Sequence, residues 1–219
     1  KKEDLIKLSR LCVKYNIWLI SDEAYRGLSY NKSLFSNSVW SIIEKESPGI
    51  KGRRISIESS SKVWNACGLR IGAIVTDSID FHEKSVSEYT ANLCANAIGQ
   101  EIFGALAHEN FSDLNKWILK HRNYYKKMML QLRLKLLKEM PGLIVSIPEA
   151  AIYIIIDFRL ISDKNFNSID FVKYCASKGK VDIDGKLFTL LLAPMSGFYS
   201  KSDKGRTQLR LAMVENKKL

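Results

Sequence analysis

The sequence predicts an α/β fold in which a mostly parallel sheet is followed by a smaller α+β unit. Two apolar runs, "IWLISDEAY" at 17–25 and "RISIES" at 54–59, end in acidic or hydroxyl side chains, which is typical of buried parallel strands whose carboxyl ends face a ligand. After a long helical segment the pattern changes to short apolar runs typical of strands. We therefore expect one domain over 1–110 and a second over 111–219.

The composition is that of an ordinary globular protein. The chain has 219 residues, of which 46% are hydrophobic and 26% charged. Its longest apolar runs, at 151–156 and 187–193, are too short to span a bilayer, so we expect no membrane partner. The three histidines lack ligand spacing, and no metal is expected. The cysteines form no C-x-x-C pair, which predicts free, buried thiols in a reducing cytoplasm: Cys12, Cys67, Cys94 and Cys175.

The elements of the first domain follow from local patterns. The opening "KKEDLIKLSRLCVKYN" has helical apolar spacing, and Asn16 is a plausible stop. A strand is expected at 17–20, a second at 54–59 and a third at "IGAIVTD", 71–77. The polar stretch 31–54, which contains "SPGIKGRR", is interpreted as a loop.

A long basic helix is predicted over 112–139. Its eight Lys/Arg and two Asp/Glu contribute much of the net charge of +11. Because the apolar residues recur at steps of three and four, the basic residues fall on a solvated face, and no nucleic-acid partner is expected. His121 lies on the apolar stripe, where a core histidine is more common than a catalytic one. The stripe consists of Leu114, Ile118, His121, Tyr125, Met128, Leu132 and Leu136.

The second domain combines strands with one helix. "PG" at 141–142 ends the long helix, and a further helix is expected near Ser168 to Ser177. The predicted strands are "LIVSI", "AIYIIIDF", "LFTLLLA" at 187–193 and "TQLRLAMV".

The stretch "SSSKVWNACGLRIG" at 59–72 carries the most specific chemistry in the chain. A lysine that acts as a nucleophile needs neighbours that stabilise the iminium it forms. The serines and Arg70 beside Lys62 suit a phosphate, because hydroxyls and a guanidinium donate to its oxygens. Gly68 and Gly72 allow the backbone to approach a ligand closely.

An amine-reactive aldehyde that also bears a phosphate describes pyridoxal phosphate. This cofactor forms a Schiff base with a lysine, and its ring nitrogen needs an acidic partner to act as an electron sink. Asp22, at the end of an earlier predicted strand, is available for the ring nitrogen, and Tyr25 is available for the phenolic oxygen.

Three motifs together resemble one known family. "SDEAY" at 21–25, "SSSKVWNACGLRIG" at 59–72 and "QLRLAM" at 208–213 are similar, in order and spacing, to the carboxyl-terminal part of a class I/II aminotransferase of fold type I, such as the aspartate aminotransferases. The resemblance covers essentially the whole chain. It implies a partial cofactor-binding large domain followed by the small α+β domain.

The resemblance also implies roles for individual residues. Lys62 would form the Schiff base with pyridoxal 5'-phosphate and act as general base, and Arg210 would bind the α-carboxylate of an amino acid or 2-oxo acid. The full enzyme is expected to be a cytoplasmic homodimer of amino acid metabolism. The other cofactor-binding residues implied are Asp22, Tyr25, Ser59, Ser61 and Arg70.

The sequence departs from the family in three places. Ser60 stands where the family signature usually has an apolar residue or threonine, and "PEAAIY" at 148–153 lacks a glycine common at the matching turn. Family members carry a phosphate-binding turn, a stacked aromatic ring and an asparagine before the matched region, and this chain begins after them at Lys1. We therefore expect a fragment that is inactive alone.

Two other functions remain open. A lyase of the same fold would release ammonia and pyruvate in place of a keto acid and a transferred amino group. A non-catalytic aminotransferase-like sensor domain would be attached to a DNA-binding module. Substrate choice is not specified, because "TANLCANAIGQ" at 90–100 offers no second cation for a side-chain carboxylate.

Overall fold

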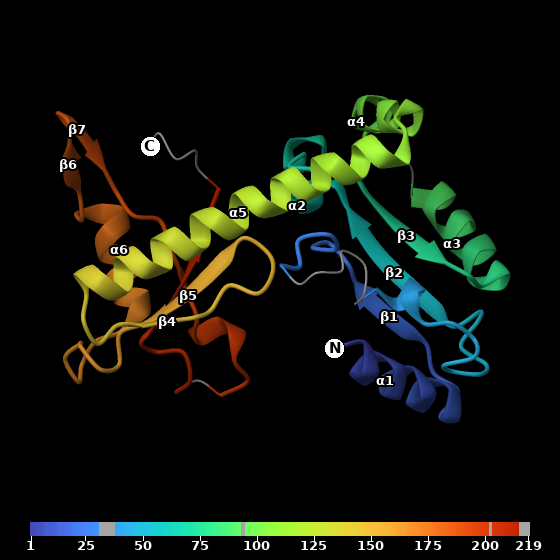
Figure 1. The fold of residues 1–219 in the computed structure, drawn as a ribbon, viewed down its shortest axis with the longest axis horizontal. Coiled ribbons are helices and arrows are strands. Elements are labelled where there is room, and N and C mark those ends of the chain that lie inside the picture. The colour runs from blue at the N-terminus through green and yellow to red at the C-terminus, as the bar shows by residue number, and fades with distance from the viewer. Residues whose placement is uncertain (31–37, 93–94, 202, 215–219) are drawn as a thin grey trace. The chain divides into compact units, whose positions relative to one another are not determined.

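The computed structural model describes residues 1–30, 38–92, 95–201 and 203–214. It divides into two compact units, Lys1–Arg122 and Asn123–Leu219, each with a sheet of its own (Figure 1). The boundary between the units lies inside one long helix, α5 (Phe111–Glu139). The domain division at residues 110 and 111 stays a prediction, because contacts alone do not show which segments fold independently.

The sheet of the first unit has the order β1-β2-β3, with β1 (Leu19–Asp22), β2 (Arg54–Ser59) and β3 (Gly72–Thr76). β1 and β2 are parallel, as predicted, whereas β3 runs antiparallel to β2. The link between β2 and β3 holds only the one-turn helix α2 (Ser60–Val63) and the 3-10 helix η2 (Cys67–Leu69). Parallel strands need a longer crossover, so this short link returns the chain in the opposite direction.

Helices α1 (Lys2–Lys14) and α3 (Ile79–Asn92) lie on opposite sides of this sheet (Figure 1). Cys12 of α1 packs with Leu19 of β1 in a buried apolar cluster. Phe81 of α3 lies 5.5 Å from Trp18 between ring centroids. The predicted stop of α1 is confirmed, since the helix ends before Asn16, whose φ of 55° is left-handed.

One face of the sheet carries isoleucines that the described residues leave largely uncovered. Ile20 is 60% exposed, and Ile57 and Ile74, which pair across β2 and β3, are 44% and 59% exposed. Ile55 on the same face is buried. The run at 17–20 is therefore not buried on both faces within the described chain.

The segment between β1 and β2 contributes to the core although it was predicted as a loop. Its described part is irregular apart from the 3-10 helix η1 (Val39–Ser41), and residues 31–37 lie outside the described chain. Val39, Ile42 and Ile50 are fully buried against α1 and β1. An apolar cluster of this size fixes the loop to the sheet.

The predicted long helix is confirmed by α5, which begins at Phe111 and is preceded by α4 (Ala97–Gly104) and the 3-10 helix η3 (Ala105–His108). Ile118, Tyr125 and Met128 of the predicted stripe are buried, and so is Met129 beside them. No described helix is both long and apolar enough to cross a membrane.

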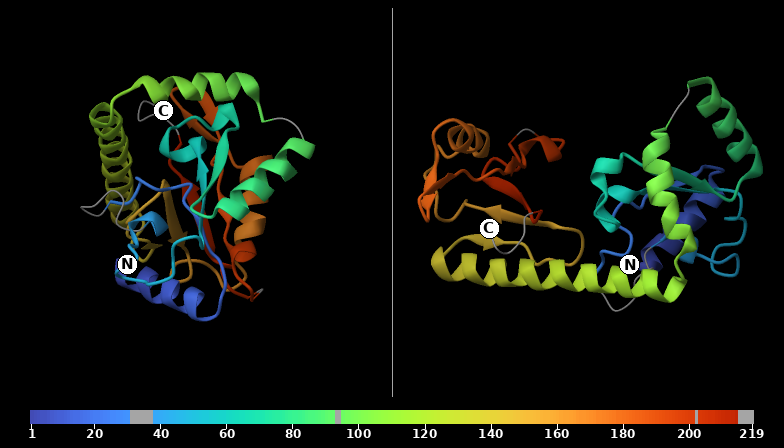
Figure 2. Two further views of the ribbon diagram at one scale, coloured as in Figure 1. Left: turned by 90° about the vertical axis from the view of Figure 1, so that its right-hand side faces the viewer. Right: turned by 90° about the horizontal axis from the view of Figure 1, so that it is seen from above.

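The second unit contains an antiparallel sheet of order β4-β5-β9-β8. Ile154 and Ile156 of β5 and Leu209 of β9 form its buried side. Helix α6 (Ser168–Ser177), drawn in orange in Figure 2, occupies the predicted range. The strands are β4 (Ile144–Val145), β5 (Tyr153–Asp157), β8 (Ala193–Pro194) and β9 (Gln208–Ala212).

The prediction of a single strand over 187–193 is wrong. Its first part belongs to β7 (Lys186–Phe188), which pairs with β6 (Val181–Ile183), and its last residue belongs to β8, which pairs with β9. Asp184 and Gly185 both have positive φ, of 53° and 78°, as a tight hairpin turn requires. The Asp-Gly pair was the signal for this hairpin.

The cysteine prediction holds for two of the four residues. Cys12 and Cys175 are free and buried, as expected. Cys67 is free but exposed, because it lies on the short link between β2 and β3, and Cys94 lies outside the described residues.

Candidate active site

The candidate residues of the first unit gather where β1 and β2 end. Because the two strands are parallel, their carboxyl ends lie at one edge of the sheet, and Asp22 stands opposite Ile57, two residues before Ser59. Asp22 is exposed, and its carboxylate accepts a hydrogen bond from the Ala24 N–H at 3.1 Å. Lys62 follows within the next helical turn.

The serines before Lys62 have different structural roles. Ser59 caps α2, since its Oγ accepts a hydrogen bond from the Ser61 N–H at 3.1 Å. Ser60 is buried and donates from Oγ to the Ile71 carbonyl at 3.0 Å. Ser60, where this sequence departs from the family signature, thus ties α2 to the segment that enters β3. Ser61 and Lys62 are half-buried, and in the described chain the Lys62 ammonium makes no ion pair.

His121 of α5 touches the backbone of Lys62. Its Nε2 lies 3.4 Å from the Lys62 carbonyl oxygen, which can only accept, so Nε2 donates a long hydrogen bond. The His121 ring stacks on Trp117 at 4.8 Å, and Trp117 stacks on Trp64 at 5.4 Å. Burial lowers the pKa of His121, and the contact with the Lys62 backbone opposes that shift. His121 is therefore a packed residue, as predicted.

Gly68 and Arg70 lie on the link into β3, and Gly72 is the first residue of that strand. Arg70 has a left-handed φ of 55°, is exposed, and donates from Nη1 to the Cys67 carbonyl at 3.1 Å. A Cβ on Gly72 would stand 2.9 Å from the Glu58 carbonyl oxygen, so strand pairing already requires this glycine. A Cβ on Gly68 would meet no atom within 4 Å.

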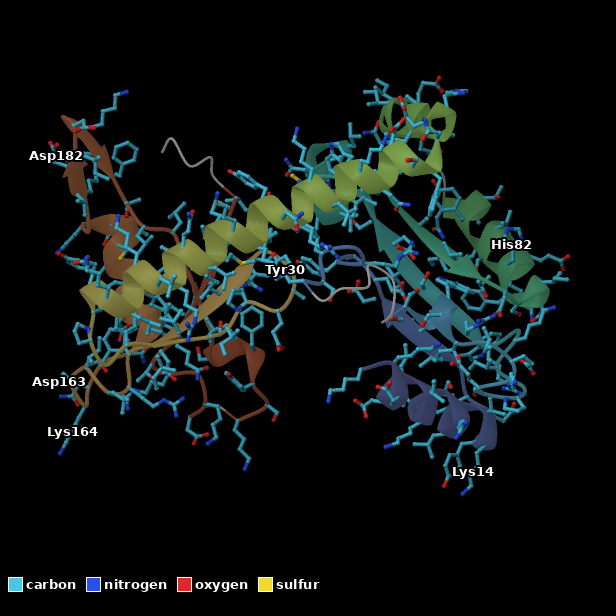
Figure 3. All side chains as sticks on the ribbon, viewed as in Figure 1. Lys14, Tyr30, His82, Asp163, Lys164 and Asp182 are labelled. Carbon is cyan, nitrogen blue, oxygen red and sulfur yellow. The ribbon has the colours of Figure 1, made fainter. Side chains whose placement is uncertain are left out.

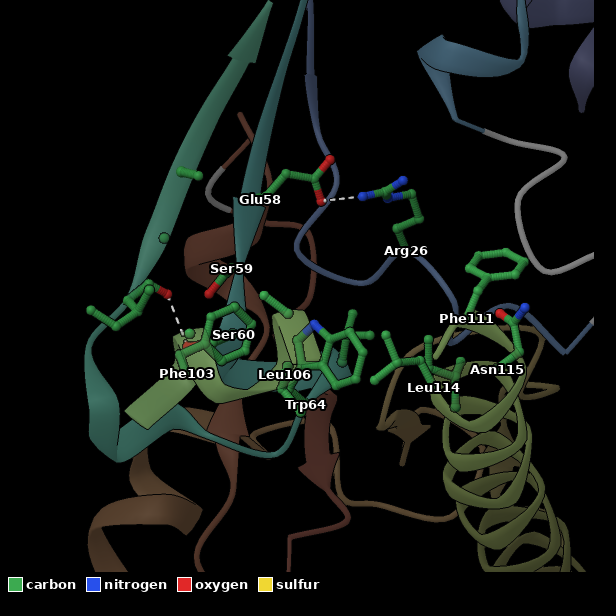
Figure 4. A pocket seen from close by; sticks show the side chains of 17 residues that line it. Arg26, Glu58, Ser59, Ser60, Trp64, Phe103, Leu106, Phe111, Leu114 and Asn115 are labelled. Atoms are coloured by element: carbon green, nitrogen blue, oxygen red, sulfur yellow. Dashed lines mark hydrogen bonds and ion pairs between the residues drawn. The ribbon is translucent and has the colours of Figure 1, made fainter. Parts of the chain in front are cut away.

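Three charged residues near the site were missed by the sequence analysis. Arg26 forms ion pairs with both Glu23 and Glu58, and Figure 4 shows the pair with Glu58. Each stands beside a predicted site residue in the chain, since Glu23 follows Asp22 and Arg26 follows Tyr25. Glu23 and Arg26 are only three residues apart in the chain, whereas the strand register brings Glu58 to them, and sequence periodicity does not show that register.

Arg210 lies in the second unit, on the central strand β9. Its guanidinium carbon is 4.4 Å from the Tyr153 ring centroid and 4.7 Å from that of Phe198. Contacts with aromatic rings hold a guanidinium without using its N–H donors. Among the described residues Arg210 makes no ion pair, which leaves those donors for an anion.

Asp157 anchors the start of the strand that carries Arg210. Burial alone would raise the pKa of Asp157, but hydrogen bonds from Arg159, Thr207 and Gln208 outweigh it and lower the pKa from 3.8 to about 2. Thr207 Oγ1 and Gln208 Nε2 donate to the carboxylate at 2.7 Å and 2.9 Å. The ionised carboxylate therefore joins the end of β5 to the beginning of β9.

A cavity of about 560 Å³ lies beside the site but is not centred on it. Ser59, Ser60 and Trp64 line it together with apolar residues of α5, whereas Lys62 does not (Figure 4).

The histidines are potential metal ligands, and one of them, His82, lies on α3 (Figure 3). Within the described ranges no group of three or more His, Cys, Asp or Glu is arranged to hold a metal ion.

The chain is similar in sequence to known aminotransferases. The family described as aminotransferase class I and II matches residues 1–189. A probable aspartate/prephenate aminotransferase of Aquifex aeolicus is 24% identical over 183 residues, which cover 84% of this chain and 44% of that protein. Human kynurenine–oxoglutarate transaminase 3 is 28% identical over 220 residues, which cover 94% of this chain and 44% of that protein.

Solved structures show the same fold. The α-aminoadipate aminotransferase LysN of Thermus thermophilus, complexed with N-(5'-phosphopyridoxyl)-L-leucine, superimposes with a TM-score of 0.71 at 18% identity over 95% of this chain and 48% of that one. An aromatic aminotransferase of Pyrococcus horikoshii gives 0.70 at 24% identity, over 99% and 51%. The chain thus spans about half the length of these proteins. It belongs to the class I and II aminotransferases and has their fold type I architecture.

Proposed function

We propose that this chain is the carboxyl-terminal part of an enzyme that uses pyridoxal phosphate to transfer an amino group between an amino acid and a 2-oxo acid. The observation that carries the proposal is the gathering of Asp22 and Lys62 at one edge of a parallel strand pair. A carboxylate for a pyridine nitrogen and an amine for an aldehyde are the two groups this cofactor needs.

The donor set fits the cofactor. Lys62 offers an ammonium without an ion pair in the described chain, and Asp22 offers an exposed carboxylate. The hydroxyls of Ser59 and Ser61 and the guanidinium of Arg70 would hold the phosphate, and Tyr25 the phenolic oxygen. When bound, the cofactor supplies an electron sink that acidifies the substrate α-carbon.

The chain's own residues then orient the substrate and move a proton. Arg210, held against Tyr153 and Phe198, donates two parallel hydrogen bonds to the α-carboxylate. With its amine free, Lys62 takes the α-proton at Nζ as a general base. Fixing the carboxylate orients the C–H bond for this transfer.

The assembled protein is proposed to be a cytoplasmic homodimer. The free thiols of Cys12, Cys67 and Cys175 suit a reducing compartment. The exposed isoleucines of the first sheet suit burial by further protein surface. Gel filtration of the protein at full family length would show a dimer mass, and a monomer would contradict this part of the proposal.

Amino-group transfer tests the activity. Aspartate, alanine and an aromatic amino acid are offered as donors to 2-oxoglutarate with excess pyridoxal phosphate, using the chain together with the remaining half of the family fold as a separate chain. We expect keto acid and transferred amino group in equal amounts, none with Lys62→Ala, and unchanged rates with the surface control Lys120→Ala. Ammonia and pyruvate would point to a lyase, and undiminished rates in Lys62→Ala would refute the role of Lys62.

A further inference from the structure

An ionic triad of Glu23, Arg26 and Glu58 lies next to the candidate site residues. Glu23 is 5% exposed, and its carboxylate accepts hydrogen bonds from Ser38 Oγ at 2.7 Å and the Val39 N–H at 2.8 Å. Arg26 Nε lies 3.3 Å from Glu23 Oε2. Arg26 Nη2 lies 3.0 Å from Glu58 Oε2, and this second ion pair is the dashed line between the two residues in Figure 4. One guanidinium therefore bridges two carboxylates.

The strand register explains why the bridge is needed. Asp22 stands opposite Ile57, and the Glu23 N–H donates to the Ile57 carbonyl at 2.9 Å, so Glu23 and Glu58 follow side by side at the end of the strand pair. Two adjacent carboxylates repel each other in a partly dry environment. Arg26 offsets this repulsion and holds the strand ends at one spacing.

The triad is also anchored to the sheet. Ser56 Oγ donates to Glu58 Oε1 at 2.9 Å, and Trp40 Nε1 donates to Ser56 Oγ at 2.9 Å. Together with the bonds from Ser38 and Val39, these contacts leave the carboxylates little freedom to move. The triad is thus fixed from the segment between β1 and β2 as well as from β2 itself.

Each member of the triad is one residue away from a candidate cofactor-binding residue. Glu23 follows Asp22, Arg26 follows Tyr25, and Glu58 precedes Ser59. Glu58 and Ser59 are neighbours in β2, and Glu23 directly follows the last residue of β1. Tyr25 and Arg26 lie in the turn after β1, where the Arg26 N–H donates to the Glu23 carbonyl at 2.9 Å. Because the peptide bond is planar, fixing one residue of each pair restricts the backbone of its neighbour, so holding the triad restricts the backbone that carries Asp22, Tyr25 and Ser59.

Energetics favour a positional role over a stabilising one. Buried ion pairs are poor sources of stability, because the cost of removing charges from water offsets their attraction, and apolar replacements are often neutral. Such groups are better suited to fixing one arrangement among several. We propose that Glu23, Arg26 and Glu58 are positioning residues that set Asp22, Tyr25 and Ser59 for the cofactor, an inference that rests on the proposed function.

Covalent trapping on this chain tests the proposal without requiring turnover. The Lys62 amine condenses with the aldehyde of pyridoxal phosphate, losing one water to form a C=N bond, and borohydride then reduces that bond by hydride addition. Mass spectrometry of the peptides gives the fraction of Lys62 labelled at each concentration. We expect half-maximal labelling to need about tenfold or more pyridoxal phosphate in Arg26→Lys, whose single ammonium cannot fork to both carboxylates.

A second variant removes the charges together. In Glu23→Gln/Arg26→Met/Glu58→Gln no charge is left unpaired, so the fold should persist while the spacing of the strand ends is no longer set. Circular dichroism and urea unfolding verify the fold. We expect the same loss of Lys62 labelling, with labelling of surface lysines in the same sample unchanged.

The matched control is the Arg54–Asp77 ion pair at the other end of β2. Arg54 Nη2 lies 2.6 Å from Asp77 Oδ2, and both side chains are mostly buried. Arg54 also stacks over the ring of Trp40, which anchors the triad through Ser56, so the control changes only the partner of Arg54. Asp77→Asn should alter unfolding but keep the concentration dependence of Lys62 labelling within about twofold of the parent chain, because Asp77 pairs with Arg54 at the end of β2 remote from Glu58.

The outcomes separate this inference from the proposed function. If the parent chain labels Lys62 and both triad variants label it with the same concentration dependence, the positional role is wrong while the function stands. An equal loss in the Asp77→Asn control would show that the triad acts through general stability and would also overturn the inference. If Lys62 is labelled neither in the parent chain alone nor in the parent chain supplemented with the remaining half of the family fold, the proposed function itself fails.

Discussion

Ala151 stands where the chain needs a left-handed residue. Its φ is 62°, at the turn in "PEAAIY" that lacks the glycine common in the family. A Cβ makes this conformation costly, so Ala151→Gly should stabilise the protein by about 1 kcal/mol. Urea unfolding measures the change. Ala150→Gly, at a neighbour without positive φ, is the control and should destabilise or leave stability unchanged.

The ionisation of Asp157 makes the free energy of unfolding depend on pH. Since its pKa is about 2 in the folded chain against 3.8 ordinarily, its ionised form contributes about 2 kcal/mol at neutral pH. A lowered pKa means that this stability is present above pH 3.8 and is lost as the pH falls toward 2.

The Asp157→Asn variant tests this linkage. The loss relative to the parent chain should be clear in urea unfolding at pH 7 and should shrink near pH 2. Asp203→Asn, at an exposed carboxylate, serves as the control and should change little. A loss for Asp157→Asn that is the same at both pH values would contradict the assigned cause.

At the residue scale, residue types and their spacing indicate which cofactor the chain binds, but they do not show which side chains touch. The types and spacing of Lys62, Asp22 and Arg70 indicate pyridoxal phosphate from the sequence alone. The bridge through Arg26 was not predictable, because it depends on which strand residues stand opposite each other. The aromatic contacts of Arg210 likewise come from residues distant in the chain.

At the scale of elements, a substitution at Gly72 tests the connection between β2 and β3, which carries Lys62. A Cβ there would stand 2.9 Å from the Glu58 carbonyl, so Gly72→Ala should shift β3 from β2 and cost about 1–3 kcal/mol. Hydrogen exchange of the β2 and β3 amides should accelerate. Gly68→Ala, where a Cβ meets nothing within 4 Å, is the matched control and should leave exchange unchanged. Equal effects of the two changes would show that close approach is not the cause.

Elements with strong local periodicity were predictable. β2 over Arg54–Ser59, α6 over Ser168–Ser177 and nearly all of α5 match their predicted ranges, because each pattern is complete within the segment. The direction of β3 was not predicted, since it depends on the length of the link before it. The prediction of a single strand over 187–193 was wrong, because an apolar run indicates that a segment is buried or paired but does not show which strand each part of it pairs with.

At the scale of the whole molecule, the uncovered sheet face predicts self-association. Ile20, Ile57 and Ile74 expose apolar surface on one face, and apolar patches of this kind drive association. Light scattering of residues 1–219 should therefore show oligomers or aggregates. Ile57→Thr/Ile74→Thr should lower the scattering mass, whereas Leu134→Thr, at an exposed residue of α5, should not. A monodisperse monomer for the parent chain would contradict this prediction.

Locating the lysine that carries the label is the most direct test of whether Lys62 binds pyridoxal phosphate. Residues 1–219 are incubated with limiting pyridoxal phosphate, reduced with borohydride, digested and mapped by mass spectrometry. If Lys62 binds the cofactor, the pyridoxyl group should be concentrated on Lys62, at a higher level than its half-buried side chain would reach without specific binding. Label spread over exposed lysines such as Lys116 and Lys120, with Lys62 unmodified, would contradict it.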